Sequence, residues 1–391
     1  MKICYVIAEY NPLHNGHLKH INFIKQTLSA DKVIVIMSGN FVQRGEPAVL
    51  NKFKRATHAI QCGADLVIEL PTPFATANAE TFALGAVKVI NSLNLQGTLC
   101  FGVENGNKEQ YLSLAKILVS ESKEFKKALK ENLEQGVSLA KAKSDAVKKV
   151  YQLEFAEQLT CRPNNILALE YVKALLKTKS NVDFYPMLRT GDHNDKKLYK
   201  NITSATSIRE VLKTGKLRKL KKVMPNFTYK SLNGYPEKYD SLALLSLIRE
   251  GVNGIKLCPD CTEGLENRIS AFASKCESLQ ELIKETITKR YTETRVKRII
   301  LSNFLKITQD FLQESLKCKL YAKVLAISES SLSLLSEITN ASSIPLLTRK
   351  TDESKLSDSA KKVFDKDLLA SELYGFITGE KQNPYQMIIV K

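Results

Sequence analysis

The side chains of this sequence that could do chemistry are concentrated close to its N-terminus. Three of the five histidines, His14, His17 and His20, lie within seven residues of one another. Where a strand turns into a helix, unpaired N–H groups and a partial positive charge lie at the helix start. Imidazole N–H groups beside such a start can donate hydrogen bonds to phosphate oxygens. The pattern predicts a phosphate-binding site in which His14 and His17 are the catalytic groups.

The segments that must position these histidines follow from the apolar pattern. Residues 3–8 form a short apolar run typical of a buried strand, and Asn11-Pro12 ends it in a turn. A helical pattern begins at once, with apolar residues on one face at Leu18, Ile21, Ile24 and Leu28. Further strands are expected at 33–37, 65–69, 98–101 and 182–188, separated by helices. This alternation predicts an α/β fold with a parallel sheet, whose ligand lies beyond the carboxyl ends of the strands.

Charge and composition narrow the class of protein. The chain carries 58 lysine and arginine residues against 41 aspartate and glutamate residues, a formal net charge of +17. That excess favours a polyanionic partner, with nucleic acid as the first candidate. No apolar run approaches the roughly 18–20 residues that a membrane span needs, and no signal-peptide pattern is present. We therefore expect a cytoplasmic protein with no membrane partner, and we infer no protein partner.

The eight cysteines do not indicate a metal centre. They are scattered along the chain, and Cys258 and Cys261 are the only close pair. A four-ligand zinc site needs two further cysteine or histidine ligands at suitable spacing, and no second pair exists. Ordinary reduced thiols and no protein-borne metal site are therefore expected.

The charge balance and the expected secondary structure of the sequence change near residue 215. Seven basic residues and no acidic one occur between Lys213 and Lys230, and helical patterns dominate beyond them. We predict two domains. Residues 1–215 form the nucleotide-binding catalytic domain, with helices on both faces of its sheet, and residues 216–391 form a mostly α-helical, basic, RNA-binding domain.

Several further motifs occur in a fixed order along the chain. After the His14-Asn-Gly-His17 turn come Met37-Ser-Gly-Asn-Phe-Val-Gln-Arg-Gly-Glu-Pro-Ala48, Gly63-Ala-Asp-Leu-Val-Ile-Glu-Leu-Pro71, Phe101-Gly-Val-Glu104, Pro163-Asn-Asn-Ile166, Ser204-Ala-Thr-Ser-Ile-Arg209 and Glu263-Gly-Leu-Glu-Asn-Arg-Ile269. The HxGH turn resembles the signature of the nucleotidyltransferase superfamily. The whole set closely resembles the bacterial tRNA(Met) cytidine acetate ligase family (TmcAL). Leu13 departs from the family's usual Phe, and Val103 from its usual small polar residue.

The resemblance implies a fold, a reaction and a set of binding residues. The implied fold is a Rossmann-like nucleotidyltransferase (HUP-type) sheet. The implied reaction activates acetate with ATP, forms acetyl-adenylate and pyrophosphate, and acetylates the wobble cytidine of elongator tRNA(Met) at N4. Magnesium is expected with the ATP, and acetyl-CoA is not used. The implied ATP-binding residues are Ile7, Ala8, Glu9, Tyr10, Asn11, Pro12, Leu13, His14, Asn15, Gly16, His17, Leu18, Lys19, His20, Gly102, Asn164 and Arg189.

Other polar residues are weaker candidates. We expect Lys289, Arg290, Arg295 and Arg298 to contact the tRNA backbone from the face of a helix. Gln43, Arg44, Lys52 and Arg55 could contact pyrophosphate or tRNA, and Ser204, Thr206, Ser207 and Arg209 could close over the leaving pyrophosphate. Two other functions stay open: a small-molecule adenylyltransferase, and a non-catalytic RNA-binding protein. Without the family resemblance, the residues alone predict a nucleotidyltransferase-like protein with a nucleic-acid partner.

Overall fold

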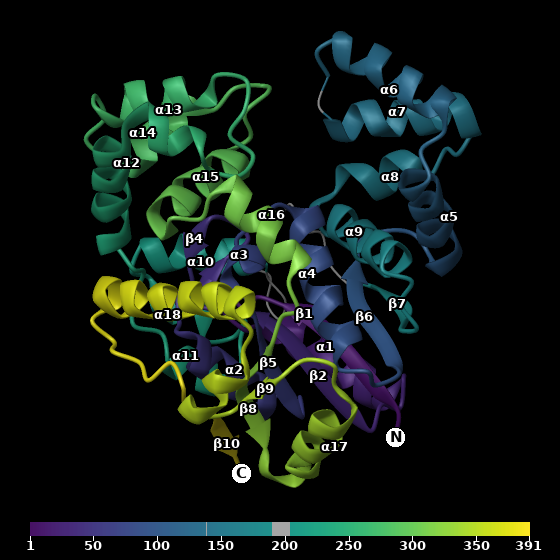
Figure 1. Cartoon of the computed structure of the whole chain (residues 1–391), viewed down its shortest axis with the longest axis vertical. Coiled ribbons are helices and arrows are strands. Elements are labelled where there is room, and N and C mark those ends of the chain that lie inside the picture. Colours follow the sequence, from purple (N-terminus) through teal and green to yellow (C-terminus); the bar gives the residue numbers. More distant parts are fainter. Residues whose placement is uncertain (138, 190–203) are drawn as a thin grey trace.

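An eight-stranded sheet runs through the molecule (Figure 1) in the order β10–β8–β5–β2–β1–β6–β7, with β9 paired to β8. The structure, a computed structural model, describes residues 1–137, 139–189 and 204–391. The strands are β1 (Ile3–Ala8), β2 (Lys32–Ser38), β5 (Leu66–Leu70), β6 (Gly97–Val103), β7 (Asp183–Leu188), β8 (Ala322–Ser328), β9 (Leu346–Leu347) and β10 (Ile388–Val390). Among the described strands of this sheet, only β5 and β8 pair antiparallel; the other neighbouring strands are parallel.

Strand β1 lies inside the sheet, between β2 and β6, because both of its faces are apolar. Tyr5 and Ile7 point into one core, and Cys4 and Val6 point into the other. Its register pairs Cys4 with Val33 of β2 and with Thr98 of β6. Parallel strands that are buried on both faces show this continuous apolar pattern. The expected strands at 3–8, 33–37, 65–69, 98–101 and 182–188 are therefore confirmed.

Helices cover both faces of the sheet, as predicted. Helices α1 (Asn15–Gln26) and α2 (Lys52–Gln61) pack on one face, and α4 (Ala79–Ser92) and α9 (Pro163–Lys177) pack on the other. The remaining N-terminal helices are α3 (Thr72–Ala75), α5 (Lys108–Val119), α6 (Lys123–Glu134), α7 (Leu139–Tyr151), α8 (Ala156–Cys161) and α10 (Ala205–Lys213). A short hairpin of β3 (Phe41–Val42) and β4 (Glu46–Pro47) follows β2.

The C-terminal part is mainly helical, as expected, but it also completes the sheet. Strands β8, β9 and β10, which we did not predict from the sequence, join the sheet beside β5. The helices after α10 are α11 (Asn226–Lys230), α12 (Lys238–Lys256), α13 (Leu265–Ala273), α14 (Leu279–Thr286), α15 (Glu293–Leu305), α16 (Gln309–Lys317), α17 (Ser333–Ala341) and α18 (Asp358–Thr378), with 3₁₀ turns η1 (Leu217–Leu220), η2 (Glu329–Ser331) and η3 (Lys350–Lys355). The division of the chain near residue 215 stays a prediction.

Two groups of helices extend beyond the end of the sheet that is far from the N-terminus (Figure 1). Helices α6 and α7 form one, and α12 to α15 form the other around a hydrophobic core of their own. Because the parallel strands start near the N-terminus, this end holds their carboxyl ends. None of the described helices is long and apolar enough to cross a membrane.

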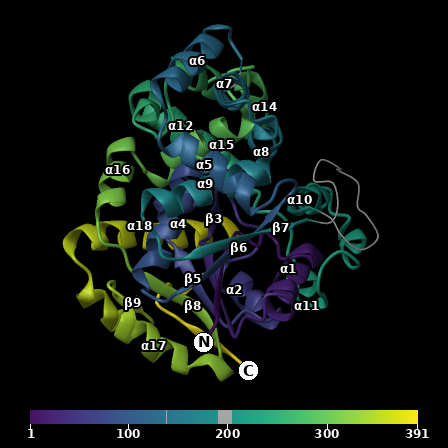
Figure 2. The ribbon, with the colours of Figure 1, turned by 90° about the vertical axis from the view of Figure 1, so that its right-hand side faces the viewer.

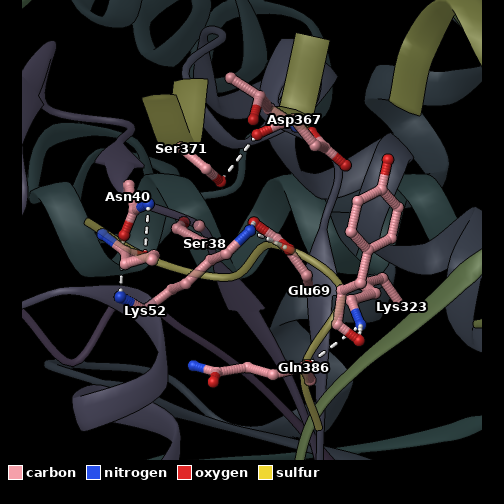
Figure 3. A network of polar contacts seen from close by, with 12 residues as sticks. Ser38, Asn40, Lys52, Glu69, Lys323, Asp367, Ser371 and Gln386 are labelled. Atoms are coloured by element: carbon pink, nitrogen blue, oxygen red, sulfur yellow. Dashed lines mark hydrogen bonds and ion pairs between the residues drawn. The ribbon is translucent and has the colours of Figure 1, made fainter. Parts of the chain in front are cut away.

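A buried polar network joins α2, β5, β8 and α18 (Figure 3). Lys52 donates to both carboxylate oxygens of Glu69 at 2.8 Å, and each side chain is 2 % exposed. Asp367 of α18 accepts from the Thr72 N–H at 2.7 Å, and Lys323 of β8 donates to the Gln386 carbonyl at 3.1 Å. The Asp367–Thr72 bond connects helix α18 to the start of α3, directly after β5.

Candidate active site

The turn after β1 places His14 and His17 against each other at the start of α1. The Nδ1 atom of His14 accepts the Gly16 N–H at 3.0 Å, and Nδ1 of His17 accepts the His14 N–H at 3.3 Å. This reciprocal arrangement is a capping box in which imidazoles replace the usual hydroxyl and carboxylate. The two rings stack with their centroids 3.9 Å apart.

The capping bonds determine where each neutral imidazole carries its proton. Because Nδ1 accepts a backbone N–H in both His14 and His17, the ring proton of the neutral form lies on Nε2. The ring of Tyr10 meets the ring of His17 edge-on, with centroids 4.9 Å apart, and further restricts its rotation. Both histidines therefore have a fixed tautomer, with Nε2–H as their donor.

Contacts from outside the motif hold the turn in place. Arg55 is fully buried and donates to the carbonyls of Glu9 at 2.6 Å and Ser38 at 3.0 Å, at the carboxyl ends of β1 and β2. Arg209 of α10 donates to the Asn11 carbonyl at 2.9 Å and forms an ion pair with Glu46 at 2.8 Å. Burial raises the pKa of the Glu9 carboxyl, while Arg44 and Arg209 lower it.

These contacts correct two of the weaker expectations. Lys52 and Arg55 are 1 % and 0 % exposed, and both are engaged with buried partners, so they are not surface contacts for pyrophosphate or tRNA. Ser204 caps α10 by accepting the Ser207 N–H at 3.1 Å, and Arg209 is 5 % exposed beneath the turn. Arg209 therefore positions the turn and is not placed to close over a leaving group.

A second set of predicted residues meets at the carboxyl ends of β6 and β7. The Arg189 N–H donates to the Val103 carbonyl at 2.8 Å, and the Arg189 side chain lies against Gly102. Asn164, at the start of α9, accepts from the Arg189 guanidinium at 3.5 Å and donates to Glu104 at 2.5 Å. Burial lowers the pKa of Arg189 to about 10, opposed by Glu104, so the guanidinium stays charged at neutral pH.

Glu104 is a member of this set to which sequence reasoning assigned no role. It lies directly after β6, in the Phe101-Gly-Val-Glu104 motif, and orients Asn164 and charge-balances Arg189. Its position directly after a predicted strand could have identified it from the sequence, because polar residues there face the ligand side of a parallel sheet.

His20 and Lys19 differ in their surroundings. The Nε2 atom of His20 lies 3.3 Å from Sγ of Cys100 on β6, so its ring sits between α1 and the sheet. Burial, with a smaller contribution from Arg189, lowers the pKa of His20 to about 4 and keeps the ring neutral. Lys19 is exposed on the outer side of α1.

The two groups of residues flank the point where the strand order reverses. The chain passes from β1 to β2 on one side, and later returns to β6 on the other side of β1. In open parallel sheets the ligand lies at such a point, beyond the carboxyl ends of the strands. The turn at residues 9–17 and the group of Gly102, Asn164 and Arg189 thus face the same region of the molecule.

Comparison with known proteins assigns a family to this arrangement. The model of the HIGH nucleotidyl transferase family matches residues 1–387. The tRNA(Met) cytidine acetate ligase of Caldanaerobacter subterraneus subsp. tengcongensis is 39 % identical over 380 residues, covering 94 % of each chain. The enzyme of the same name from Clostridium perfringens is 37 % identical over 390 residues, covering 96 % of each chain. The chain belongs to the tRNA(Met) cytidine acetate ligase family.

Solved structures of this family agree with the fold. The structure of Thermotoga maritima TmcAL bound with alpha-thio ATP superposes with a TM-score of 0.91 at 27 % identity, and the apo form superposes with a TM-score of 0.93. Each match covers the whole of both chains. The Rossmann-like nucleotidyltransferase fold predicted for the tRNA(Met) cytidine acetate ligase family is thereby confirmed. The assignment of individual ATP-binding residues stays a prediction.

The residues predicted to contact tRNA are only partly on one surface. Helix α15 begins at Glu293, so Arg290 precedes it and does not share a helix face with Arg295 and Arg298. Arg295 donates to Thr262 at 2.7 Å, and Arg298 lies 3.8 Å from the Asp260 carboxylate. Lys289 and Arg290 are exposed.

The cysteines of the one close pair lie in a buried environment. Cys258 and Cys261 are buried and unbridged, and burial raises the pKa of each to about 12. Among the residues that the structure describes, no three His, Cys, Asp or Glu side chains gather in a way that could hold a metal ion.

Proposed function

We propose that this protein is an ATP-dependent ligase that acetylates N4 of the wobble cytidine of elongator tRNA(Met). The observation that carries the proposal is the stacked His14–His17 pair at the start of α1, directly after the interior strand β1. The chain that carries this pair matches named tRNA(Met) cytidine acetate ligases over nearly its whole length. The enzyme needs no acetyl-CoA, and its RNA substrate indicates that it acts in the cytoplasm.

In the first proposed step, an oxygen of acetate attacks the α-phosphorus of ATP. The bond from that phosphorus to the bridging oxygen breaks, so that pyrophosphate leaves and acetyl-adenylate remains. Negative charge builds on the phosphate oxygens, and donors that are already oriented toward it lower the barrier. The Nε2–H groups of His14 and His17 and the first N–H groups of α1 are these donors.

The other predicted residues hold the nucleotide. Residues 7–20 lie along its phosphates, and Gly102 near the end of β6 lets it approach the backbone. Asn164 at the start of α9 and Arg189 after β7 bind it from the other side. Magnesium is expected as the cation that accompanies ATP. When bound, it would neutralise phosphate charge.

In the second proposed step, the exocyclic amine of cytidine attacks the acetyl carbonyl. The bond from that carbonyl to the adenylate oxygen breaks, AMP leaves, and the nitrogen gives up a proton. The base must leave the stacked anticodon loop to reach the adenylate. Lys289, Arg290, Arg295 and Arg298 contact the RNA backbone, with Lys289 and Arg290 the more accessible pair.

One experiment separates this function from the alternatives. The protein is incubated with ATP, labelled acetate and an elongator tRNA(Met) transcript, with a transcript carrying uridine at the wobble position as the control. Transfer of acetate to the cytidine transcript alone supports the proposal. Pyrophosphate exchange driven by another small acid, without transfer to RNA, would point to a small-molecule adenylyltransferase. Tight RNA binding without ATP turnover would point to a non-catalytic RNA-binding protein.

A further inference from the structure

A short basic segment beside the site belongs to the part of the chain predicted to bind RNA, but none of its residues has been given a role. Residues 216–222, named here the basic strap, contain no acidic residue, and all of their cationic side chains are exposed. These cations are Lys216, Arg218, Lys219, Lys221 and Lys222. Within the described part of the chain they make no ion pair. The exposed Lys149 of α7 differs, because it lies 2.8 Å from Glu131. The positive charge of the strap is therefore uncompensated.

The C-terminal end of the strap and the helix that precedes it, α10, are both bonded to the turn that carries His14. Upstream, Arg209 of α10 donates to the Asn11 carbonyl at 2.9 Å. Downstream, the Asn15 backbone N–H donates to the Val223 carbonyl at 3.1 Å, and its side-chain amide donates to the Lys222 carbonyl at 3.1 Å. Figure 2 shows α1, α10 and α11 on the same side of the sheet. The strap is therefore held next to the phosphate-binding turn.

The backbone of the strap is anchored by a small apolar core. Leu220 is completely buried, and it packs with residues of α10, of the segment before α2 and of the chain after the strap, namely Val49, Leu50, Ile208, Leu212, Val223 and Met224. Because Leu217–Leu220 forms a 3₁₀ turn with Leu220 inward, the basic side chains between the buried positions point to solvent. The strap presents its charges on a fixed backbone.

We infer that the basic strap binds the phosphate backbone of the acceptor RNA and holds it beside the adenylate; this inference rests on the proposed function. The ATP phosphates are assigned to the start of α1, so cations that point outward from the neighbouring strap are available to a second polyanion. Closely spaced, unpaired cations match the regular phosphates of RNA and release its counterions on binding. Such contacts position the RNA without reading its sequence.

The test compares two variants that lose the same charge at different places. The strap variant is Lys216→Gln/Arg218→Gln/Lys219→Gln/Lys221→Gln, which leaves Lys222 and its bond to Asn15 intact. The control is Lys123→Gln/Lys126→Gln/Lys127→Gln/Lys130→Gln on the exposed face of α6. For each full-length protein, the dissociation constant for elongator tRNA(Met) is measured over a range of KCl concentrations. Acetate-driven ATP–pyrophosphate exchange is measured without RNA, and thermal unfolding checks the fold.

We expect the strap variant to bind tRNA at least about 10-fold more weakly at physiological salt, with a salt slope lower by about 2–3. The α6 control should stay within about 3-fold of the wild type, and pyrophosphate exchange should be unchanged in both. Equal affinity of the two variants would overturn the inference. A parallel loss of exchange in the strap variant would also overturn it, because the strap would then serve the nucleotide. Failure of the wild type to exchange with acetate would instead refute the proposed function, while the RNA comparison would still test the strap.

Discussion

Gly102 on β6 and Arg189 after β7 are so close that a side chain at position 102 would press on the arginine. A Cβ atom there would lie 3.0 Å from Cγ and 3.1 Å from Cδ of Arg189. The missing Cβ therefore lets the guanidinium reach Asn164 across the end of β6, at 3.5 Å.

Gly102→Ala should weaken ATP binding by about 3- to 10-fold, because the new Cβ displaces the Arg189 side chain by a few tenths of an ångström. The melting temperature should hardly change, since that side chain can shift to make room. Calorimetric titration with ATP measures the effect. Arg189→Ala should weaken binding as well, and the double variant should be no weaker than Arg189→Ala alone, since both changes act on one contact. Additive losses would show that Gly102 acts independently of Arg189.

The two roles of His14, cap and phosphate donor, can be separated by substitution. His14→Ala removes both the Nδ1 acceptor of the helix cap and the Nε2 donor, whereas His14→Asn supplies a good cap without an imidazole. We expect acetate-driven ATP–pyrophosphate exchange to fall by roughly 10²–10³ in both variants. The free energy of unfolding should fall by about 1 kcal/mol in His14→Ala only. Near-normal exchange by His14→Asn would mean that the histidine serves only as a cap.

His17→Ala should reduce exchange by a similar factor, roughly 10²–10³, because the second Nε2 donor is lost. Its affinity for tRNA should not change, since His17 lies within the nucleotide turn. Filter binding measures the affinity for the transcript, and the ATP–pyrophosphate exchange assay measures the loss of activity. A loss of tRNA affinity of the same size as the loss of exchange would contradict this assignment.

Removing one partner of the buried Lys52–Glu69 pair should lower the stability of the protein strongly. Lys52→Met leaves the Glu69 carboxylate buried without its cation, which costs about 3–5 kcal/mol when one partner of a buried pair is removed. Denaturant unfolding measures the loss. The matched control is Lys52→Met/Glu69→Leu, which removes both charges and should recover part of the stability. If the free energy of unfolding of Lys52→Met lies within about 1 kcal/mol of the wild-type value, well below that typical cost, the structural role of the pair is contradicted.

Acid should destabilise the protein partly through His58. Burial, assisted by Lys54 and Arg55, lowers the pKa of His58 from 6.5 to about 4. Between these values the unfolded chain binds the proton and the folded chain does not, so the free energy of unfolding decreases as the pH falls from about 6.5 to 4.

His58→Gln keeps a side chain that can donate to Ser231, which lies 3.1 Å from Nε2 of His58, but it cannot titrate. Its unfolding free energy should therefore fall less steeply in this window, by up to about 3 kcal/mol over the full range. Urea unfolding of both proteins at several pH values gives the two slopes, and subtraction removes the contribution of His20. Identical slopes would show that His58 is not buried in its neutral form.

Local patterns were sufficient to predict the nucleotide-binding half of the sheet. The apolar run at residues 3–8, the Asn11-Pro12 turn and the helical spacing after His17 involve neighbours in sequence, and the structure confirms all three. The family resemblance named Gly102 and Arg189 as binding residues. The alignment of carboxyl ends in a parallel sheet explains why the structure places them next to each other.

Features that depend on distant partners could not be predicted in this way. Lys52 looked like a surface cation because its partner Glu69 lies on a strand whose distance from α2 is set by the fold. Strand β8 lies in a segment with mostly helical neighbours, and its partner β5 is near the other end of the chain. The capping bonds of His14 and His17 depend on a tautomer that the sequence does not specify.

The antiparallel pairing of β8 with β5 has a consequence for the order of events during synthesis. Strand β5 is paired on one side by β2, but its other edge is covered only by β8. That edge stays unpaired while the ribosome adds residues 71–321, which takes roughly 10–50 s at ordinary elongation rates. Throughout this interval the nascent nucleotide-binding sheet exposes a template for strand pairing. The protein therefore closes its sheet at the end of translation, with residues made long after the strands that they protect.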